Sequence, residues 1–210
     1  LNLAASLSAA SRKVLLVDLD SQGNSTTGIG MEKREETGSL IDVLVKNDGH
    51  LNLVIEETRY KFDLIPASSD LISAEIELSS LKNPTAILRS KLQQVASKYD
   101  YIVIDCPPSL GMLSVSALRA ASKVLIPLQC EYYSLEGLAA MNKTIKEINE
   151  ATGESIEIDG ILRTMYDSRI RLSREVSKEL EEHFSEKLCD TVIPRLSLIH
   201  ISEPTRPYSI

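Results

Sequence analysis

The sequence predicts an α/β protein whose mostly parallel sheet carries helices on both faces. Short segments rich in Val, Ile and Leu alternate along the chain with longer segments whose apolar residues recur at every third or fourth position. The short segments show no polar alternation, which is typical of strands buried on both faces of a parallel sheet. With 210 residues, of which 43% are hydrophobic, the chain is long enough for one large domain.

The first half of the chain is expected to supply three strands with helices between them. Residues 1–10 are rich in Ala and Leu and favour a helix. Three short apolar runs are predicted as strands, Lys13–Val17, Phe62–Pro66 and Tyr101–Asp105. A short helix is expected at Ser39–Val45. A longer one is expected at Pro84–Ser97, where a proline stands near the start and apolar residues fall on one face, Leu88, Leu92 and Val95.

The second half of the chain continues the alternation. Three further strands are predicted, at Lys123–Pro127, Ile156–Thr164 and Thr191–Pro194. Between the first two, apolar residues at helical spacing indicate a helix, Leu138, Met141, Ile145 and Ile148. Residues 171–185 form an amphipathic pattern in which an apolar residue returns at every fourth position, Leu172, Val176, Leu180 and Phe184.

Charge and cysteine content exclude several classes of protein. The net charge is −7, so a globally basic nucleic-acid binder is not indicated, and any DNA contact must come from a local patch. Cys106, Cys130 and Cys189 are few, odd in number and widely spaced, which favours reduced thiols over a disulfide framework, a zinc site or a metal cluster. No apolar run reaches the roughly 18 residues of a membrane span. We therefore expect a cytoplasmic protein with no membrane partner.

Three aspartates follow predicted strands at the point where each strand ends. Asp18 and Asp20 close the first strand, and Asp105 closes the strand Tyr101–Asp105. In parallel sheets, ligands bind outside the carboxyl ends of the strands, and carboxylates that meet there repel one another unless a cation lies among them. Mg²⁺ accepts one or two carboxylates and takes phosphate oxygens and waters as its other ligands. The pattern thus favours a nucleotide–Mg²⁺ site, with simple capping of helices or turns as the alternative.

Several stretches, in this order, resemble the ParA/Soj-type ATPases of chromosome and plasmid partitioning. They are LNLAASLSAASRKVLLVDLDSQGNSTTGIG (1–30), LIPASSDLISAEIEL (64–78), YDYIVIDCPPSLG (99–111), VLIPLQCEYYSLEGL (124–138), GILRTMYDSR (160–169) and TVIPR (191–195). The resemblance covers residues 1–195. It implies a P-loop NTPase fold of the group with a deviant phosphate-binding loop.

No G-x-x-x-x-G-K-[ST] motif occurs in these residues. In the family, the phosphate-binding loop lies immediately before the helix that begins here, so the resemblance implies that the loop and the first strand lie upstream of Leu1. Residues 1–195 are expected to be an incomplete ATPase domain, which by itself is inactive. Residues 196–210 depart from the family pattern and are expected to be a non-native tail in place of the last strand and helix.

The resemblance assigns roles in ATP hydrolysis with Mg²⁺. Asp20 corresponds to the catalytic aspartate that positions the attacking water. Asp105 corresponds to the Walker B aspartate that holds Mg²⁺ through water, and Asp18 is expected to support the metal and nucleotide site. The loop after Asp20 is expected to respond to the γ-phosphate, Gln22, Gly23 and Asn24. Met165 and Tyr166 are weaker candidates for the wall of the adenine pocket.

The resemblance also implies partners. Arg169 aligns with an arginine that the family uses for non-specific DNA binding, and Arg171 and Arg174 follow it in a locally basic segment from Arg163 to Lys178. Phosphate contacts of this kind need no base recognition. The alternative is a solvated helix face with ordinary ion pairs. The family forms ATP-dependent homodimers on the nucleoid, and a ParB-like partner stimulates hydrolysis.

Two other functions stay open at this point. A MinD-type ATPase that positions proteins at membranes shares the same fold, but the "QCEYYSLEGL" and "TMYDSR" stretches favour the partition branch. A non-catalytic fragment or a regulatory relative that binds nucleotide without turnover is the second alternative.

Overall fold

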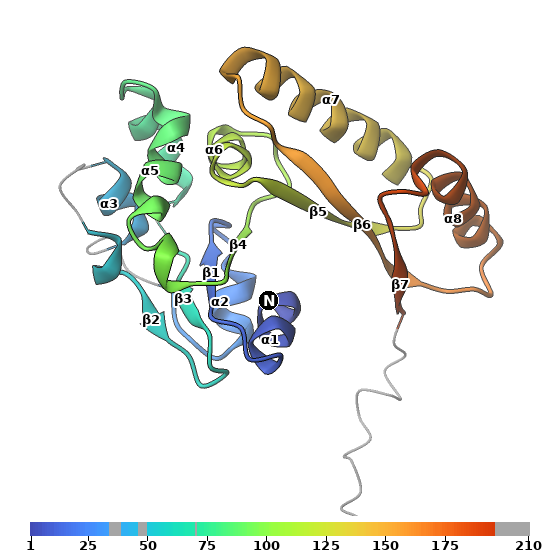
Figure 1. Ribbon diagram of the computed structural model, residues 1–210, viewed down its shortest axis with the longest axis horizontal. Coiled ribbons are helices and arrows are strands. Elements are labelled where there is room, and N and C mark those ends of the chain that lie inside the picture. Colours follow the sequence, from blue (N-terminus) through green and yellow to red (C-terminus); the bar gives the residue numbers. More distant parts are fainter. Residues whose placement is uncertain (34–38, 46–49, 70, 196–210) are drawn as a thin grey trace, which may run out of the picture. The chain divides into compact units, whose positions relative to one another are not determined.

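The computed structural model describes residues 1–33, 39–45, 50–69 and 71–195 (Figure 1). These residues form two compact units, Leu1–Ala121 and the described part of Ser122–Ile210. The single domain predicted over 1–195 stays a prediction, and the expected tail at 196–210 lies outside the described residues.

The first unit contains a four-stranded sheet in the order β2-β3-β1-β4. Its strands are β1 (Val14–Asp18), β2 (Glu56–Glu57), β3 (Asp63–Ile65) and β4 (Tyr101–Asp105). β1 pairs in parallel with both β3 and β4, whereas β2 runs antiparallel to β3. The mostly parallel sheet that the sequence predicts is therefore confirmed, and β1 lies between two parallel neighbours.

Helices cover both faces of this sheet. They are α1 (Asn2–Ala9), α2 (Asn24–Gly28), α3 (Leu40–Val45), α4 (Leu71–Ser79), α5 (Ile87–Gln93) and α6 (Met112–Ala120), with the single turns η1 (Leu51–Leu53), η2 (Pro84–Ala86) and η3 (Ala96–Lys98). Because successive strand residues point to opposite faces, β1 contributes to two cores. Leu15 and Val17 pack with residues of α3, α5 and α6, whereas Val14 and Leu16 pack with Ala4 of α1.

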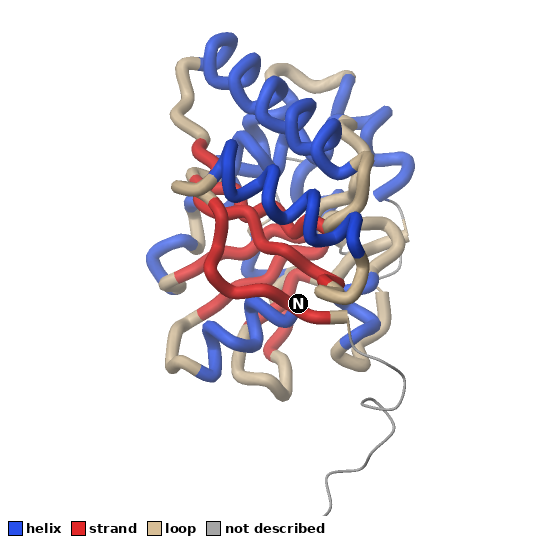
Figure 2. Tube along the Cα trace, turned by 90° about the vertical axis from the view of Figure 1, so that its right-hand side faces the viewer, coloured by secondary structure: helices blue, strands red, loops and turns tan. Residues whose placement is uncertain are grey.

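The second unit is a three-stranded parallel sheet in the order β5-β6-β7. Its elements are β5 (Lys123–Gln129), α7 (Ser134–Thr152), β6 (Glu157–Tyr166), α8 (Arg171–Phe184) and β7 (Leu188–Pro194). Figure 2, viewed from the right-hand side of Figure 1, shows these two helices in front of the strands. One core joins the sheet to both helices, through Leu128, Leu138, Ile161, Val176 and Leu180.

Three features differ from the sequence expectation. The helix predicted at 84–97 is divided into η2, α5 and η3. Leu172 was expected on the buried face of α8 but is 41% exposed, because it lies in the first turn and outside the core that Val176 and Leu180 join. The helices α2, α4 and α6 and the strand β2 were not predicted. The five residues of α2 are mostly polar and carry no apolar period, so their fold depends on contacts described below.

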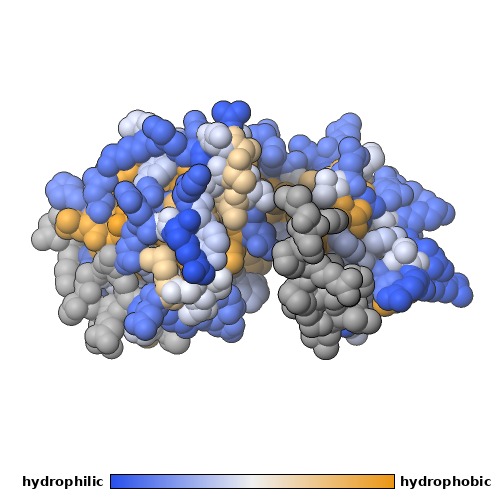
Figure 3. All heavy atoms as spheres, turned by 90° about the horizontal axis from the view of Figure 1, so that it is seen from below, coloured by the Kyte–Doolittle hydropathy of each residue, from blue (hydrophilic) through white to orange (hydrophobic). Residues whose placement is uncertain are grey.

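The visible surface agrees with the composition. Seen from below in the orientation of Figure 1, the described side chains are mostly hydrophilic, with small apolar patches between them (Figure 3). Among the described residues, no helix combines the length and the apolar character that a membrane crossing requires.

Arg163 of β6 is a buried cation that joins three elements of the second unit. The residue is 9% exposed. Its Nη1 donates hydrogen bonds to Ser177 Oγ (2.8 Å) and to Glu181 Oε1 (2.7 Å) of α8, and its Nη2 donates to the Cys189 carbonyl oxygen of β7 (3.2 Å). Arg163 therefore does not add to the surface charge of the basic segment from Arg163 to Lys178.

We expect substitution of Glu181 and substitution of Arg163 to lower the free energy of unfolding by different amounts. Glu181→Ala leaves a buried guanidinium without its carboxylate and should cost about 2 kcal/mol of unfolding free energy, less than a fully buried pair because the Glu181 side chain is 57% exposed. Arg163→Met removes the buried charge itself and should cost only about 1 kcal/mol. Urea unfolding followed by circular dichroism measures both, with the exposed Glu186→Ala as the control. A larger cost for Arg163→Met than for Glu181→Ala contradicts the interpretation.

Candidate functional site

The predicted carboxylates meet at one edge of the first sheet. Asp18 is the last residue of β1 and stands in register with Asp105, the last residue of β4. The backbone N–H of Leu19 donates to the Asp105 carbonyl oxygen (2.8 Å), so the chain leaving β1 stays attached to β4 for one more residue. Asp20 follows at the exit of β1, half-buried. The carboxyl ends of the parallel strands thus present acidic side chains together.

Asp18 is fully buried and holds the following loop. Its Oδ1 accepts a hydrogen bond from the Asp20 N–H (3.2 Å), and its Oδ2 accepts bonds from the Thr26 N–H (2.9 Å) and the Thr26 hydroxyl (2.7 Å). The Thr26 hydroxyl in turn accepts a bond from the Ala67 N–H (2.9 Å). Burial raises the pKa of Asp18, while the bonds from Thr26 act in the opposite direction. Both oxygens of Asp18 therefore already have donors, which favours a positioning role over direct contact with a metal.

Asp105 is joined to the start of α2. The hydroxyl of the buried Ser25 donates to Asp105 Oδ2 at 2.6 Å. Together with the Asp18–Thr26 bonds, this contact fixes two successive residues of α2 to the ends of two strands. These bonds explain why a mostly polar segment without apolar periodicity forms a helix at this place. Sequence reasoning missed Ser25 and Thr26, because their hydroxyl groups bond to strand-end carboxylates distant in the sequence and do not cap α2, whose N-cap is Gly23.

The loop from Asp20 to Asn24 has a defined turn. Asp20 Oδ1 accepts a hydrogen bond from the Gln22 N–H (2.9 Å), and the Gly23 N–H donates to the Asp20 carbonyl oxygen (2.8 Å). Gly23 adopts φ = 63°, a left-handed conformation that favours glycine. A Cβ there would also lie 2.6 Å from Cε of Lys33. The side chains of Gln22 and Asn24 are exposed and linked by a 3.4 Å hydrogen bond.

Cys106 lies immediately after Asp105. Desolvation, followed by the negative charges of Asp105 and Asp20, raises the pKa of its thiol. The thiol is therefore protonated at neutral pH and is neither a ready nucleophile nor a thiolate ligand. Cys106, Cys130 and Cys189 are all free thiols, as the sequence predicts.

The remaining predicted site residues lie in the second unit. Met165, near the end of β6, is 48% exposed and has φ = 51°, and the following Tyr166 is half-buried. The Tyr166 carbonyl oxygen accepts a hydrogen bond from the Arg195 N–H (2.9 Å). This strand end and the loop after it lead directly into α8.

Arg169 stands in that loop and is held by Asp167. Its Nε and Nη2 donate to the two oxygens of Asp167, at 2.9 and 2.7 Å. This fork, with Arg169 as the main cause, lowers the pKa of Asp167 to about 2. The Arg169 side chain is nevertheless 88% exposed, so its outer surface is open to a ligand.

The cations of α8 differ in their partners. Arg171 pairs with Glu175 (2.7 Å) and Lys178 pairs with Glu182 (3.4 Å), each at the spacing of one helical turn. Arg174 donates to the Ser168 carbonyl oxygen (2.6 Å) and has no carboxylate partner among the described residues. The alternative of ordinary ion pairs on a solvated face thus describes Arg171 and Lys178 better than Arg174.

The charge order along α8 opposes the helix dipole. No acidic residue stands in its first turn, where Arg171 and Arg174 begin the helix, and its second half is rich in glutamate. Helices are stabilised by the reverse order, because the N-terminus carries partial positive charge. The arrangement concentrates positive potential at the start of α8, where an anion would be attracted.

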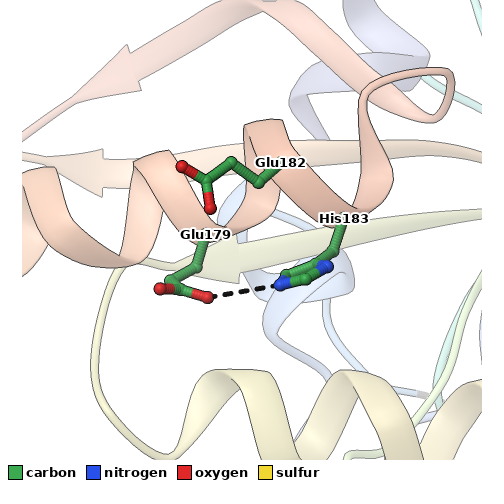
Figure 4. Close-up of side chains that lie close together, drawn as sticks. All are labelled: Glu179, Glu182 and His183. Carbon is green, nitrogen blue, oxygen red and sulfur yellow. Dashed lines mark ion pairs between the residues drawn. The ribbon is translucent and has the colours of Figure 1, made fainter.

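The acidic half of α8 also holds a small group of metal-type ligands. Glu179, Glu182 and His183 lie on one turn with their ligand atoms within 4.8 Å of one another, and His183 Nε2 lies 3.5 Å from a Glu179 oxygen (Figure 4). All three side chains are exposed. Groups of this kind are common on glutamate-rich helices and do not by themselves make a metal site.

The chain matches known proteins over most of its length. A family model described as an AAA domain (AAA_31) matches residues 1–158. The chromosome partitioning protein ParA of Myxococcus xanthus is 42% identical over 196 residues, which cover 93% of this chain and 69% of that protein. The sporulation initiation inhibitor protein Soj of Bacillus subtilis is 42% identical over 194 residues, which cover 92% of this chain and 77% of that protein.

A solved structure with a similar fold is that of the cobyrinic acid a,c-diamide synthase of Mycobacterium smegmatis, which contains a bound ATP analogue and magnesium. It is 34% identical, has a TM-score of 0.84, and covers 92% of this chain and 79% of its own. The α/β fold class that the sequence predicts is therefore shared with nucleotide-binding proteins.

Proposed function

Since the chain belongs to the ParA/Soj family of chromosome-partitioning ATPases, we propose that it acts in chromosome or plasmid partitioning as an ATP-dependent DNA-binding switch. In this proposal, ATP and Mg²⁺ bind at the carboxyl ends of β1 and β4, and ATP drives homodimerisation. The dimer binds DNA without regard to sequence, and a ParB-like partner stimulates hydrolysis. The observation that carries the proposal is the register of Asp18 and Asp105, with Asp20 and Ser25 beside them.

The donor set at this edge suits magnesium. Carboxylate and hydroxyl oxygens are the ligands that Mg²⁺ takes, and it usually keeps several waters. Asp105, hydrogen-bonded to Ser25 at 2.6 Å, would hold the ion through water. When bound, the ion supplies charge neutralisation on the phosphates of ATP. The ATP analogue and magnesium in the similar mycobacterial structure support this assignment.

The other residues of the edge have separate roles in the proposal. Asp18 holds the Asp20–Thr26 loop in place through its buried hydrogen bonds. Asp20 orients the attacking water, since Oδ2 of its carboxylate accepts no hydrogen bond from the described residues. The exposed side chains of Gln22 and Asn24 flank Gly23 and can respond to the γ-phosphate. Met165 and Tyr166 stay candidates for contact with adenine.

The proposed DNA contact lies at the start of α8. Arg169 and Arg174 stand there with exposed guanidinium groups, and the helix dipole adds to their positive potential. A single subunit neutralises few phosphates, so it binds weakly. A dimer places two such patches on one duplex, which raises the affinity through linked contacts without new chemistry. DNA binding is then expected to require ATP, to ignore base sequence and to fall steeply with salt.

The two hydrogen bonds between Arg169 and Asp167 allow a test in which one substitution should weaken DNA binding and the other should strengthen it. Arg169→Ala should weaken binding to every duplex alike, by about tenfold per lost phosphate contact, with ATP binding unchanged. Asp167→Asn should strengthen binding, because it removes a negative charge and releases Arg169 from its bidentate partner. The measurement is fluorescence anisotropy with duplexes of two sequences, at two salt concentrations, in ATP and in ADP. It uses the protein that carries the family's phosphate-binding loop ahead of Leu1.

Lys146→Ala, an exposed cation on α7, serves as the matched control and should leave DNA affinity unchanged. Equal affinity in ATP and ADP, or no change in either Arg169→Ala or Asp167→Asn, contradicts the DNA proposal. That result would favour the membrane-positioning alternative within the same fold.

A further inference from the structure

A second polar site lies at the opposite end of the first sheet. A cavity of about 480 Å³ is lined mainly by residues at or shortly before the starts of β1, β3 and β4, among them Lys13, Lys61 and Lys98. It therefore lies at the amino ends of the strands that carry Asp18 and Asp105 at their carboxyl ends. A five-residue strand spans about 16 Å, so this cavity is separate from the proposed nucleotide site. Its volume is within the usual range for sites of small ligands.

The three lysines lack a close carboxylate partner among the described residues. Lys98 Nζ donates to the side-chain oxygen of Asn52 (2.8 Å), which orients this ammonium group along the cavity wall. Three lysines from three separate segments thus line one cavity in a chain of net charge −7. The lining carries three lysines against two carboxylates, Glu57 and Asp63, and this net positive charge favours an anionic ligand.

The cavity also carries hydrogen-bond acceptors. Glu57 and Asp63 line it together with Tyr99, whose hydroxyl donates to Asp63 Oδ2 at 2.7 Å. Burial and this bond raise the pKa of the Tyr99 phenol, which therefore remains a donor at all ordinary pH values. One oxygen of Asp63 and the exposed Glu57 are left to accept hydrogen bonds from a ligand. The lining therefore matches a molecule with a phosphate for the lysines and hydroxyl groups for the carboxylates.

The backbone at Lys61 is held in a defined turn. Lys61 has φ = 62°, a left-handed conformation that is uncommon for residues with a side chain. Ser8 of α1 holds the turn, because its hydroxyl donates to the carbonyl oxygens of Tyr60 (3.2 Å) and Lys61 (2.7 Å). Glycine would satisfy the same turn without strain. This conformation belongs to the tight turn between β2 and β3, in which the Lys61 N–H donates to the Thr58 carbonyl oxygen (3.2 Å), and it sets the backbone from which the lysine side chain extends.

We propose that this cavity at the amino ends of β1, β3 and β4 binds a small phosphorylated sugar or nucleoside monophosphate. Lys13, Lys61 and Lys98 contact the phosphate, and Glu57 and Asp63 accept hydrogen bonds from the hydroxyl groups. The site is independent of the proposed ATPase site, since it shares no residue with it.

The test is isothermal titration of residues 1–210 with ribose 5-phosphate, ribose and inorganic phosphate. Saturable one-to-one binding of ribose 5-phosphate is expected, with an affinity at least tenfold higher than that of ribose or of inorganic phosphate. Lys13→Gln and Lys98→Gln should each weaken binding about tenfold, while Lys82→Gln, an exposed lysine of the same unit outside the cavity, should change nothing. Asp20→Ala and Asp105→Asn should also leave it unchanged, which separates this site from the ATPase proposal.

Lys61→Gly is the decisive variant. It removes the charge and relieves the strained turn, so it should weaken ribose 5-phosphate binding about tenfold without lowering the unfolding midpoint in urea. Absence of saturable binding up to about 10 mM overturns the proposal. So does an equal loss in Lys82→Gln, or binding of inorganic phosphate as tight as that of ribose 5-phosphate. Displacement of ribose 5-phosphate by a short DNA duplex at lower concentration would assign the lysines to a nucleic-acid backbone and also overturns it.

Discussion

Replacing Asp20 with alanine is expected to lower ATP turnover by about 100-fold or more while ATP binding is retained. The reason lies in the position of the carboxylate. It follows the end of β1, is half-buried, and uses one oxygen for the Gln22 N–H, so its other oxygen can orient a water. Phosphoryl transfer depends mainly on positioning and charge neutralisation, and the alanine variant loses the group that positions the nucleophile.

Steady-state phosphate release and ATP titration measure the two quantities in the protein that carries the family's phosphate-binding loop. Asp105→Asn is expected to act differently, by weakening Mg²⁺-dependent ATP binding, because its proposed role is on the metal. Asp190→Ala, an exposed aspartate of β7, is the control and should have wild-type turnover. If Asp20→Ala keeps turnover within a few-fold of the parent, Asp20 is not the catalytic carboxylate.

The sequence predicts β1, β3 and β4 well because each is a short run of mostly apolar residues, whereas the two-glutamate strand β2 has no apolar signal and was not predicted. β1 is buried at every position, and β4 begins and ends where its run of apolar residues does. Because the strands were expected to run parallel, with their carboxyl ends at one edge of the sheet, the sequence was enough to predict that Asp18 and Asp105 come together. Family resemblance was needed to assign roles to them.

Local sequence could not predict which polar groups the fold would bury. Arg163 was counted with the surface cations, but it shares a face of β6 with Ile161 and is buried with it. Counting in steps of two along the strand would have indicated this. Asp18 was expected to support the metal and nucleotide site, which stays a prediction, and its oxygens accept hydrogen bonds from Thr26 and from the Asp20 N–H. These bonds depend on α2, whose polar residues give no periodic signal.

Replacing Asp18 with alanine is expected to lower the free energy of unfolding by about 3 kcal/mol. Three donors lose their acceptor, namely the Asp20 N–H, the Thr26 N–H and the Thr26 hydroxyl. Each buried donor left unpaired costs about 1–3 kcal/mol, and removal of the costly buried charge offsets part of the sum. Thr26→Val should cost about 2 kcal/mol because it also leaves the Ala67 N–H unpaired, whereas Thr26→Ser keeps the hydroxyl and should cost about 1 kcal/mol.

The double variant tests whether these groups act as one network. Asp18→Ala combined with Thr26→Val should cost less than the sum of the single variants, by about 1 kcal/mol, because the second change removes a donor that the first had left unpaired. Urea unfolding gives all four free energies. Strict additivity would show that Asp18 and Thr26 stabilise the first unit independently.

The pH dependence of the unfolding free energy gives a second test of the hydrogen bonds that Asp18 accepts. Burial raises the pKa of Asp18 above 3.8 in the folded protein, so between 3.8 and the folded value the folded state binds more protons than the unfolded state. The contribution of Asp18 to stability is therefore largest below that window and falls as the pH rises through it. The cost of Asp18→Ala should accordingly be greater near pH 4 than near pH 7, measured as the difference in unfolding free energy from the parent at each pH. A cost that increases with pH would mean that the carboxylate is stabilised in its charged form, as expected if it faced a cation instead of a buried threonine.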